Sequence, residues 1–169
     1  VADFAVPGAT GSSPVIGVVP DRLLTDFLTA ELPCRDGLRR ADPARDLLKI
    51  CVLERHGKRG SIGRGFVRGF GLRDGALAST VGHDSHNVAV VGADDASMAL
   101  AVNHLRATQG GFVAVRGGRV VADLPLPIAG LMSQPMPLAS FAAASRPSVS
   151  ASRSIPAYWR IASKRLSRF

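Results

Sequence analysis

A run of polar residues between two apolar segments is the part of this sequence best suited to chemistry. His83, Asp84, Ser85 and His86 are consecutive, and Asn87 follows them. Imidazoles, carboxylates and hydroxyls are the groups that most often move protons or position a substrate in enzymes. The same residue types are also common in turns, where they bond to their own backbone. We take His83, Asp84, Ser85 and His86 as candidate catalytic residues without assigning roles, and an ordinary turn as the alternative.

The segments on either side must position this run. Residues 76–81 and 88–91 are rich in Val and Ala and are bounded by Gly, which predicts two buried strands. Each unpaired buried polar group costs about 1–3 kcal/mol, so a polar run between buried strands needs many compensating hydrogen bonds. If the run itself were extended, His83 and His86 would point to opposite faces and could not hold one metal ion together.

The charge distribution separates a nearly neutral domain from a basic end. The formal net charge is +8, but residues 1–133 hold 15 basic and all 13 acidic side chains, whereas residues 134–169 hold six basic ones. A nucleic-acid site would need a basic face with stacking aromatic residues on the folded part. Only 5% of the residues are aromatic. We therefore expect no nucleic-acid partner.

Other composition signals point to a cytoplasmic protein. No apolar run approaches the roughly 20 residues of a membrane span, and no secretory signal is recognisable. Cys34 and Cys51 form no Cys-x-x-Cys pair and have no His at metal-ligand spacing. We expect reduced cysteines, no membrane partner, and no metal or cofactor bound by this chain.

The hydrophobic patterns predict an α+β fold, with a mostly antiparallel sheet of about six strands, one main packed helix and a poorly ordered basic tail. Residues 47–54 are predicted as a central strand, because apolar residues occupy both faces. Residues 88–91 are its expected central neighbour. The segment 21–32 fits either a helix or a strand. Other strands are predicted at residues 15–19 and 66–72, and as a hairpin at 112–115 and 120–124.

The one long helix is predicted over residues 95–108. Met98, Val102 and Leu105 form an apolar stripe with helical spacing. The pair Gly110-Gly111 is predicted to supply the left-handed ending of the helix.

Shorter signals complete the expectations. Residues 73–75 are predicted as a hairpin-type turn into the next strand, and residues 128–132 as the start of a helix. The Gly-rich basic segment 56–64 could cradle an anion, but a flexible turn is favoured because the ending of a phosphate-binding loop is missing. His104 is expected at the surface or in a hydrogen bond.

Several motifs occur in an order found in one enzyme family. They are Ala-Glu-Leu-Pro at 30–33, Val-Leu-Glu-Arg-His at 52–56, Ile-Gly-Arg-Gly-Phe-Val-Arg-Gly-Phe-Gly-Leu at 62–72, Gly-Ala-Leu-Ala-Ser at 75–79, Val-Gly-His-Asp-Ser-His-Asn at 81–87, Gln-Gly-Gly at 109–111 and Leu-Pro-Leu-Pro-Ile-Ala-Gly-Leu-Met-Ser at 124–133. Over about residues 14–133 the sequence resembles the C-terminal part of the bacterial adenine deaminases of the amidohydrolase superfamily.

The resemblance implies hydrolysis of adenine to hypoxanthine and ammonia, a cytoplasmic step of purine metabolism. It also implies a manganese or iron site, whose ligands, including a His-x-His pair, lie in a (β/α)₈ barrel upstream. This sequence has no His-x-His pair. The implied partners are therefore adenine and an amidohydrolase barrel domain. His83, Asp84, Ser85 and His86 are expected to face the active site of that barrel, and the chain alone is expected to be inactive.

Beyond Ser133 the sequence departs from the family pattern. We divide the chain into an adenine deaminase C-terminal-type domain at residues 1–133 and a basic Ser/Pro/Arg-rich tail at 134–169, either disordered or frameshifted. Residues 158–169 could instead form an amphipathic helix of the membrane-surface type. Because the first residue is Val, we also expect the chain to be a fragment of a longer protein.

The alternative functions are a non-catalytic binding or assembly module, a truncated relic of the enzyme, and an interaction protein acting through its basic tail.

Overall fold

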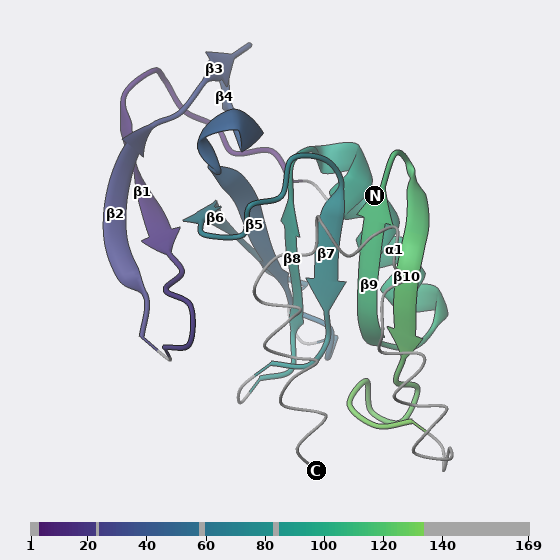
Figure 1. Ribbon diagram of the computed structural model, residues 1–169. Helices are drawn as coiled ribbons and strands as arrows, with labels where there is room; N and C mark the ends of the chain where they lie inside the picture. Colours follow the sequence, from purple (N-terminus) through teal and green to yellow (C-terminus); the bar gives the residue numbers. More distant parts are fainter. Residues whose placement is uncertain (1–3, 23, 58–59, 83–84, 134–169) are drawn as a thin grey trace.

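The computed structural model describes residues 4–22, 24–57, 60–82 and 85–133 (Figure 1). Its main feature is an eight-stranded sheet in the order β10-β9-β7-β8-β5-β6-β1-β2, beside a two-stranded β3-β4 ribbon. The strands are β1 (Ser12–Gly17), β2 (Asp26–Glu31), β3 (Cys34–Arg35), β4 (Leu38–Arg39), β5 (Leu48–Leu53), β6 (Ile62–Arg68), β7 (Ala76–Ser79), β8 (Val88–Gly92), β9 (Gly111–Arg116) and β10 (Arg119–Pro125). The helices of the described ranges are the 3-10 helix η1 (Pro43–Arg45) and the α-helix α1 (Asp95–Ala107).

The predicted α+β class is confirmed, although the sheet is wider than expected. It has eight strands rather than about six. All of its strand pairs are antiparallel except β1 with β6, which is parallel. The expected tail at residues 134–169, including the alternative helix at 158–169, lies outside the described residues.

The two strands predicted to be central, β5 and β8, are neighbours in the middle of the sheet (Figure 1). Apolar side chains of β5 are buried on both faces. Cys51 and Leu53 belong to the hydrophobic cluster under α1, and Leu48 belongs to a separate buried cluster with Val67 and Val91. This two-sided burial explains why the sequence of β5 is almost continuously apolar.

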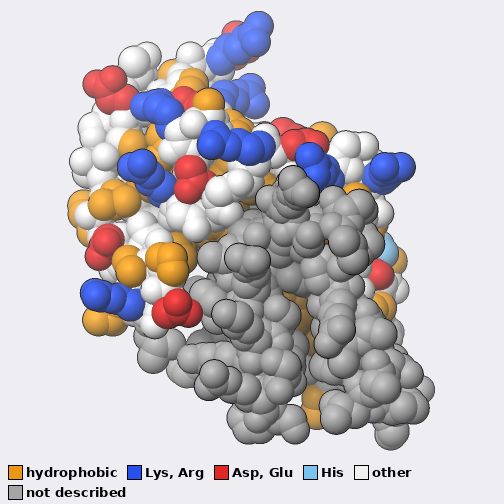
Figure 2. Space-filling model, in the orientation of Figure 1, with side chains coloured by type: hydrophobic (Ala, Val, Ile, Leu, Met, Phe, Trp, Pro, Cys, Tyr) orange, Lys and Arg blue, Asp and Glu red, His pale blue; other side chains and the backbone are white. Residues whose placement is uncertain are grey.

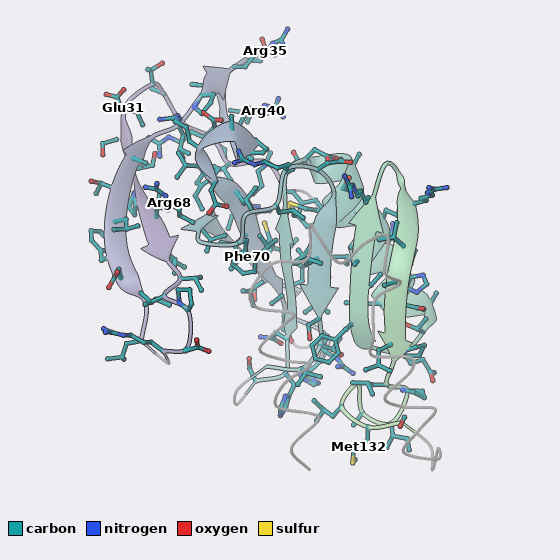
Figure 3. The ribbon with its side chains drawn as sticks, in the orientation of Figure 1. Glu31, Arg35, Arg40, Arg68, Phe70 and Met132 are labelled. Carbon is teal, nitrogen blue, oxygen red and sulfur yellow. The ribbon has the colours of Figure 1, made fainter. Side chains whose placement is uncertain are left out.

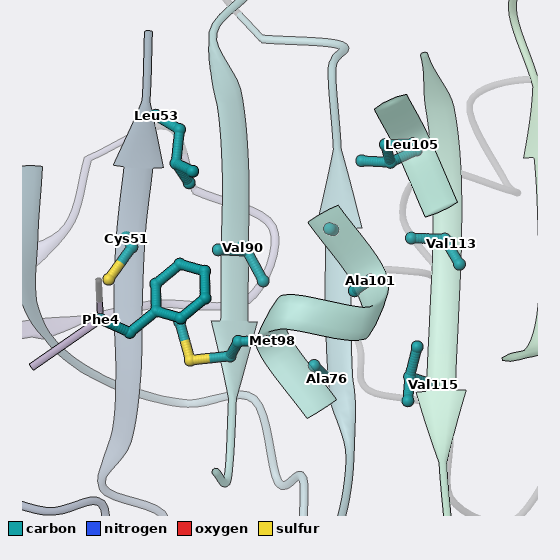
Figure 4. Packing of buried hydrophobic residues seen from close by; sticks show 11 residues of the cluster. Phe4, Cys51, Leu53, Ala76, Val90, Met98, Ala101, Leu105, Val113 and Val115 are labelled. Carbon is teal, nitrogen blue, oxygen red and sulfur yellow. The ribbon is translucent and has the colours of Figure 1, made fainter. Parts of the chain in front are cut away.

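The helix α1 lies behind β7 and β9 in Figure 1 and covers one face of the sheet. Its first turn is capped by Asp94, whose Oδ1 accepts a hydrogen bond from the Ser97 N–H at 2.7 Å. Met98, Ala101 and Leu105 are buried against the sheet, as Figure 4 shows. The predicted helix is therefore confirmed, with Met98 and Leu105 of the predicted stripe buried and Val102 only partly buried against the same cluster.

The end of α1 differs from the prediction by one residue. Gln109, with φ of 62°, takes the left-handed position that we expected from the pair Gly110-Gly111. The N–H of Gly110 then bonds the Leu105 carbonyl at 2.8 Å, which completes a Schellman-type ending. Gly111 is needed for another reason: a Cβ there would collide with the Leu124 carbonyl oxygen of β10.

Several local predictions near β6 are corrected. The segment 21–32, left open between helix and strand, contributes the strand β2. The strand expected at 66–72 is β6 and begins earlier, because Gly63 and Gly65 pair with Val52 and Ile50 of β5. Residues 73–75 do not form a hairpin turn, since β7 pairs with β8 and β9 and not with β6.

The helix predicted to begin at residues 128–132 is also wrong. An isolated antiparallel bridge joins Ile128 and Met132, and Ala129 and Gly130 have φ of 56° and 73°. Two consecutive left-handed residues reverse the chain and cannot start an α-helix. This turn, called here the 128–132 turn, follows β10 and contacts the ends of other strands.

Candidate functional site

The predicted catalytic run lies in the connection between β7 and β8. Its second half, Ser85 and His86, is described, whereas His83 and Asp84 lie outside the described residues. Ser85 is exposed and His86 is half-buried. His86 has φ of 48°, in the left-handed region, so the run is not an extended strand at this point. The connection is therefore shaped by its own backbone and by the strands on either side.

A contact beyond the end of the β5–β8 ladder helps to position this connection. The last ladder pair is Leu53 of β5 with Val88 of β8. Past it, the His56 Nε2 lies 2.9 Å from the Ser85 carbonyl oxygen. Because a carbonyl only accepts, His56 donates from Nε2. Arg55 directly precedes His56 in the sequence, and His86 directly follows Ser85.

Two buried nitrogen atoms in the segments just after β5 and just before β8 stand out. The Nη1 of Arg55 and the Nδ1 of His86 are both inaccessible to solvent, and neither has a hydrogen-bond partner in the described part of the chain. The guanidinium of Arg55 lies against the Cα of Gly130, where any Cβ would collide with it. The 128–132 turn therefore packs directly on Arg55.

Thr80 joins the end of β7 to the same turn. Its side chain is buried, with 2% of the residue exposed. Its Oγ1 accepts from the Gly111 N–H at 2.8 Å and donates to the Gly130 carbonyl at 2.7 Å. The ends of β5, β7 and β10 and the start of β9 thus meet at one end of the sheet. Met132 lies at this end in Figure 3.

Histidine and cysteine elsewhere in the fold have simpler environments. The His104 Nε2 is 2.7 Å from the Asp123 Oδ2, so the expected hydrogen-bonded role of His104 is confirmed. Cys34 and Cys51 are free thiols. Within residues 4–22, 24–57, 60–82 and 85–133, no three His, Cys, Asp or Glu side chains come together as a metal site would require. The donor set described does not fit a manganese or iron centre.

The surface charge on the described face is mixed. In Figure 2 basic and acidic side chains alternate over the part of the surface that carries β1 to β4. No helix of the described ranges is both long and apolar enough to cross a membrane.

Sequence reasoning found part of this site and missed the rest. It selected Ser85 and His86, which the structure places beside β5. It assigned His56 to a flexible loop and gave Arg55 no role. The sequence did contain one signal for them. Arg55 and His56 come just after the central strand predicted at residues 47–54, and the polar run comes just before the neighbouring strand predicted at 88–91. If these two strands are antiparallel, both segments lie at the same end of the sheet.

Comparison with known proteins identifies the family. The sequence model of the adenine deaminase C-terminal domain matches residues 22–153. The chain is 60% identical over 131 residues to an adenine deaminase of Gluconobacter oxydans, 59% over 132 residues to one of Methylobacterium nodulans, and 56% over 130 residues to one of Cereibacter sphaeroides. These matches cover 77–78% of this chain but 23% of each relative, so the chain spans about a quarter of their length. The chain therefore belongs to the adenine deaminase C-terminal domain family.

Proposed function

We propose that this chain is the C-terminal domain of an adenine deaminase and that its β7–β8 connection takes part in the active site. The reaction is hydrolytic: the oxygen of water replaces the amino group at C6 of adenine, giving hypoxanthine and ammonia. The observation that carries the proposal is the contact of His56 with Ser85, which joins the polar run to the segment that follows the central strand β5. The high identity to proteins named adenine deaminase supports the choice of reaction.

The residues of the run have chemistry that suits this reaction. The leaving amine must gain a proton, and an imidazole can supply one near neutral pH. In this proposal His83 and His86 are the candidate proton carriers, and Asp84 and Ser85 orient the substrate or the imidazoles. His56, which donates to the Ser85 carbonyl, is a positioning residue.

The proposal also includes a metal ion, a partner domain and a cellular location. A manganese or iron ion is implied by the family, but the described side chains do not assemble its ligands. We propose that an amidohydrolase barrel domain supplies the metal and completes the adenine site. We place the reaction in the cytoplasm, with no nucleic-acid or membrane partner. The domain boundary near residue 133 is part of this proposal.

A graft into a relative tests the function. Residues 14–133 of this chain replace the corresponding segment of the Gluconobacter oxydans adenine deaminase, and ammonia release from adenine is measured with added Mn²⁺ or Fe²⁺. We expect the graft to be active. His86→Gln and Ser85→Ala should each lower its kcat about tenfold or more, because loss of a proton carrier or an orienting group raises the barrier. His104→Gln is the matched control and should leave kcat within about twofold, because His104 bonds Asp123 away from the run.

The alternative is a module that only binds or assembles, and the same graft separates the two. If both variants of the run kept full kcat in a folded graft, the proposed catalytic part would be contradicted. The chain by itself is expected to release no ammonia from adenine. Turnover by the isolated chain that disappears with His83→Ala would overturn this expectation.

A further inference from the structure

Both faces of the main sheet are apolar, and α1 packs on one of them (Figure 1). The cluster under α1 takes every other residue of the central strands, such as Cys51 and Val90. The residues between them lie on the opposite face, called here the second face, because successive side chains of a strand alternate. The strand register aligns one row of the second face across six strands: Gly63, Val52, Ala89, Ser79, Phe112 and Leu124.

This row contains no charged side chain. The neighbouring row, which runs from Gly65 of β6 to Ala122 of β10, contains none either. An antiparallel sheet with one face in water normally carries polar side chains on that face, alternating with the buried apolar ones. Across these two rows the second face therefore has the composition of a buried face.

Part of the second face is nevertheless open to solvent. At one corner Leu72 and Val91 belong to a buried cluster. Away from that corner Val52 is 40% exposed, and Gly63 and Ala89 are also exposed. An exposed apolar surface on a central part of a sheet indicates a place where another surface associates.

The exposed apolar residues lie at the end of the sheet that carries the β7–β8 connection. Ala89 is three residues after His86, and Val52 pairs with it from the last turn of the β5 ladder. Three more exposed apolar side chains belong to this end: Val81 in the connection itself, and Ile128 and Met132 in the 128–132 turn. A partner that contacts the connection therefore meets apolar surface around it.

The length of the relatives indicates the partner. The matched segment is 23% of each adenine deaminase, so more than three quarters of such an enzyme lies outside it. In the proposed function that larger part shares an active site with the β7–β8 connection. The second face adjoins the connection through Ser79 on one side and Ala89 on the other.

We propose that the second face is the surface on which the rest of an adenine deaminase packs, with Val52 and Ala89 inside the contact. This inference rests on the proposed function, which brings the two parts together at the β7–β8 connection. The partner surface is apolar and uncharged where it meets the two rows, because a charge buried there would find no opposite charge in either row. A second copy of this chain and residues 134–169 are the occupants that the test separates from it.

Chemical modification of one introduced thiol tests the contact. Ala89→Cys is made in the full chain and in the Gluconobacter oxydans graft, and its reaction with a maleimide is followed by peptide mass spectrometry, which separates it from Cys34 and Cys51. The thiol at position 89 should react about tenfold or more slowly in the graft, because the core of an interface is closed to solvent. Ala107→Cys is the matched control. It replaces an exposed alanine at the end of α1 and should react at the same rate in both proteins.

A charge tests whether the contact is apolar. Val52 lies opposite Ala89 on the second face, so Val52→Lys places an ammonium beside the thiol. In the full chain this exposed substitution should shift Tm by about 3 °C or less. In the graft it should make the thiol of Ala89→Cys react about fivefold or more faster, because a buried unpaired charge opposes docking. An unchanged rate in the graft would contradict an apolar contact.

Three other results would overturn the proposal. Equal rates for Ala89→Cys in the full chain and the graft would mean that the rest of the enzyme does not cover the second face. Slow reaction in the full chain at every protein concentration would assign the face to residues 134–169, and slow reaction at high concentration alone would assign it to a second copy. If the graft does not fold, a cysteine at the aligned position of the intact Gluconobacter oxydans enzyme gives the same comparison.

These reaction rates involve neither adenine nor ammonia, so the docking surface and the proposed function can fail separately. A protected thiol in a folded graft that releases no ammonia would support the docking surface and contradict the proposed function. An active graft with an unprotected thiol would do the reverse.

Discussion

The Thr80 hydroxyl donates to the Gly130 carbonyl at 2.7 Å, across a sequence separation of 50 residues. The same oxygen accepts the Gly111 N–H at 2.8 Å. One buried side chain therefore satisfies two backbone groups, one at the start of β9 and one in the 128–132 turn. This arrangement holds the turn over Arg55 and so builds the end of the sheet where the candidate site lies.

Thr80→Val should destabilise the fold, because it keeps the shape of the side chain but leaves two buried backbone groups unpaired. We expect a loss of about 2–4 kcal/mol in the free energy of unfolding, measured by urea denaturation. Thr80→Ser keeps the hydroxyl and should cost about 1 kcal/mol or less. Equal stability of Thr80→Val and the native chain would show that the two hydrogen bonds contribute nothing.

Lys49 and Asp95 form an ion pair in which Lys49 is buried and Asp95 is partly exposed. Substituting one residue should therefore change the free energy of unfolding by a different amount than substituting the other. The side chain of Lys49 is 3% exposed, and its Nζ lies 2.5 Å from the Asp95 Oδ1 in the first turn of α1, whereas the Asp95 side chain is 37% exposed. Asp95→Ala leaves a buried charge without its partner and should cost about 2 kcal/mol or more. Lys49→Met fills the same space without a charge and should cost less. Urea denaturation of both variants measures the difference, and a larger loss for Lys49→Met would contradict this account.

Much of the fold could be predicted because its strongest signals are local. The strand β5, the helix α1 and the β9–β10 hairpin follow from apolar spacing and turn residues within short segments. The start of β6 could not be predicted in this way, because Gly63 and Gly65 have low strand propensity and are placed by pairing with β5. The width of the sheet depends on the parallel contact of β1 with β6, which joins segments far apart in sequence.

The candidate site was predictable only in part for a related reason. The polar run is visible in the sequence because such residues seldom separate two buried strands. Arg55 and His56 look like ordinary loop residues, and only the folded chain brings His56 to the Ser85 carbonyl and Arg55 to Gly130. The role of Gly130 depends on a turn that the sequence pattern suggested as a helix.

Asp42 should give the stability of the chain a specific dependence on pH. A side-chain hydrogen bond from Arg45 holds the pKa of Asp42 below its usual value of 3.8, partly opposed by burial. A carboxyl with a lowered folded pKa stabilises the fold above its unfolded pKa, and the effect is lost as the pH falls through the folded pKa. The native chain should therefore be more stable than Asp42→Asn between pH 5 and 7, about the range where Asp is fully ionised in both states.

The difference should shrink as the pH is lowered below 3.8. Urea denaturation at a series of pH values measures it. In an Arg45→Ala background the side-chain hydrogen bond is absent and only backbone N–H groups still lower the pKa of Asp42, so the Asp42→Asn difference should depend less on pH. A pH-independent difference in the native background would contradict the assignment.

Gly75 and Gly117 both have positive φ, but only Gly75 also lacks space for a side chain. Comparing them distinguishes the cost of backbone strain from the cost of a steric clash. Gly75 has φ of +85°, and a Cβ there would collide with the Val115 carbonyl oxygen of β9, the strand that β7 pairs with. Gly117 has φ of +56° in the β9–β10 turn, and no heavy atom lies within 4 Å of an added Cβ. Gly117→Ala should cost only the backbone strain, about 1–2 kcal/mol. Gly75→Ala adds a clash with backbone that can be relieved only by moving β7 from β9, so we expect about 3 kcal/mol or more. The two variants are compared by urea denaturation and by soluble yield, and equal losses would mean that the β7–β9 contact can shift without cost.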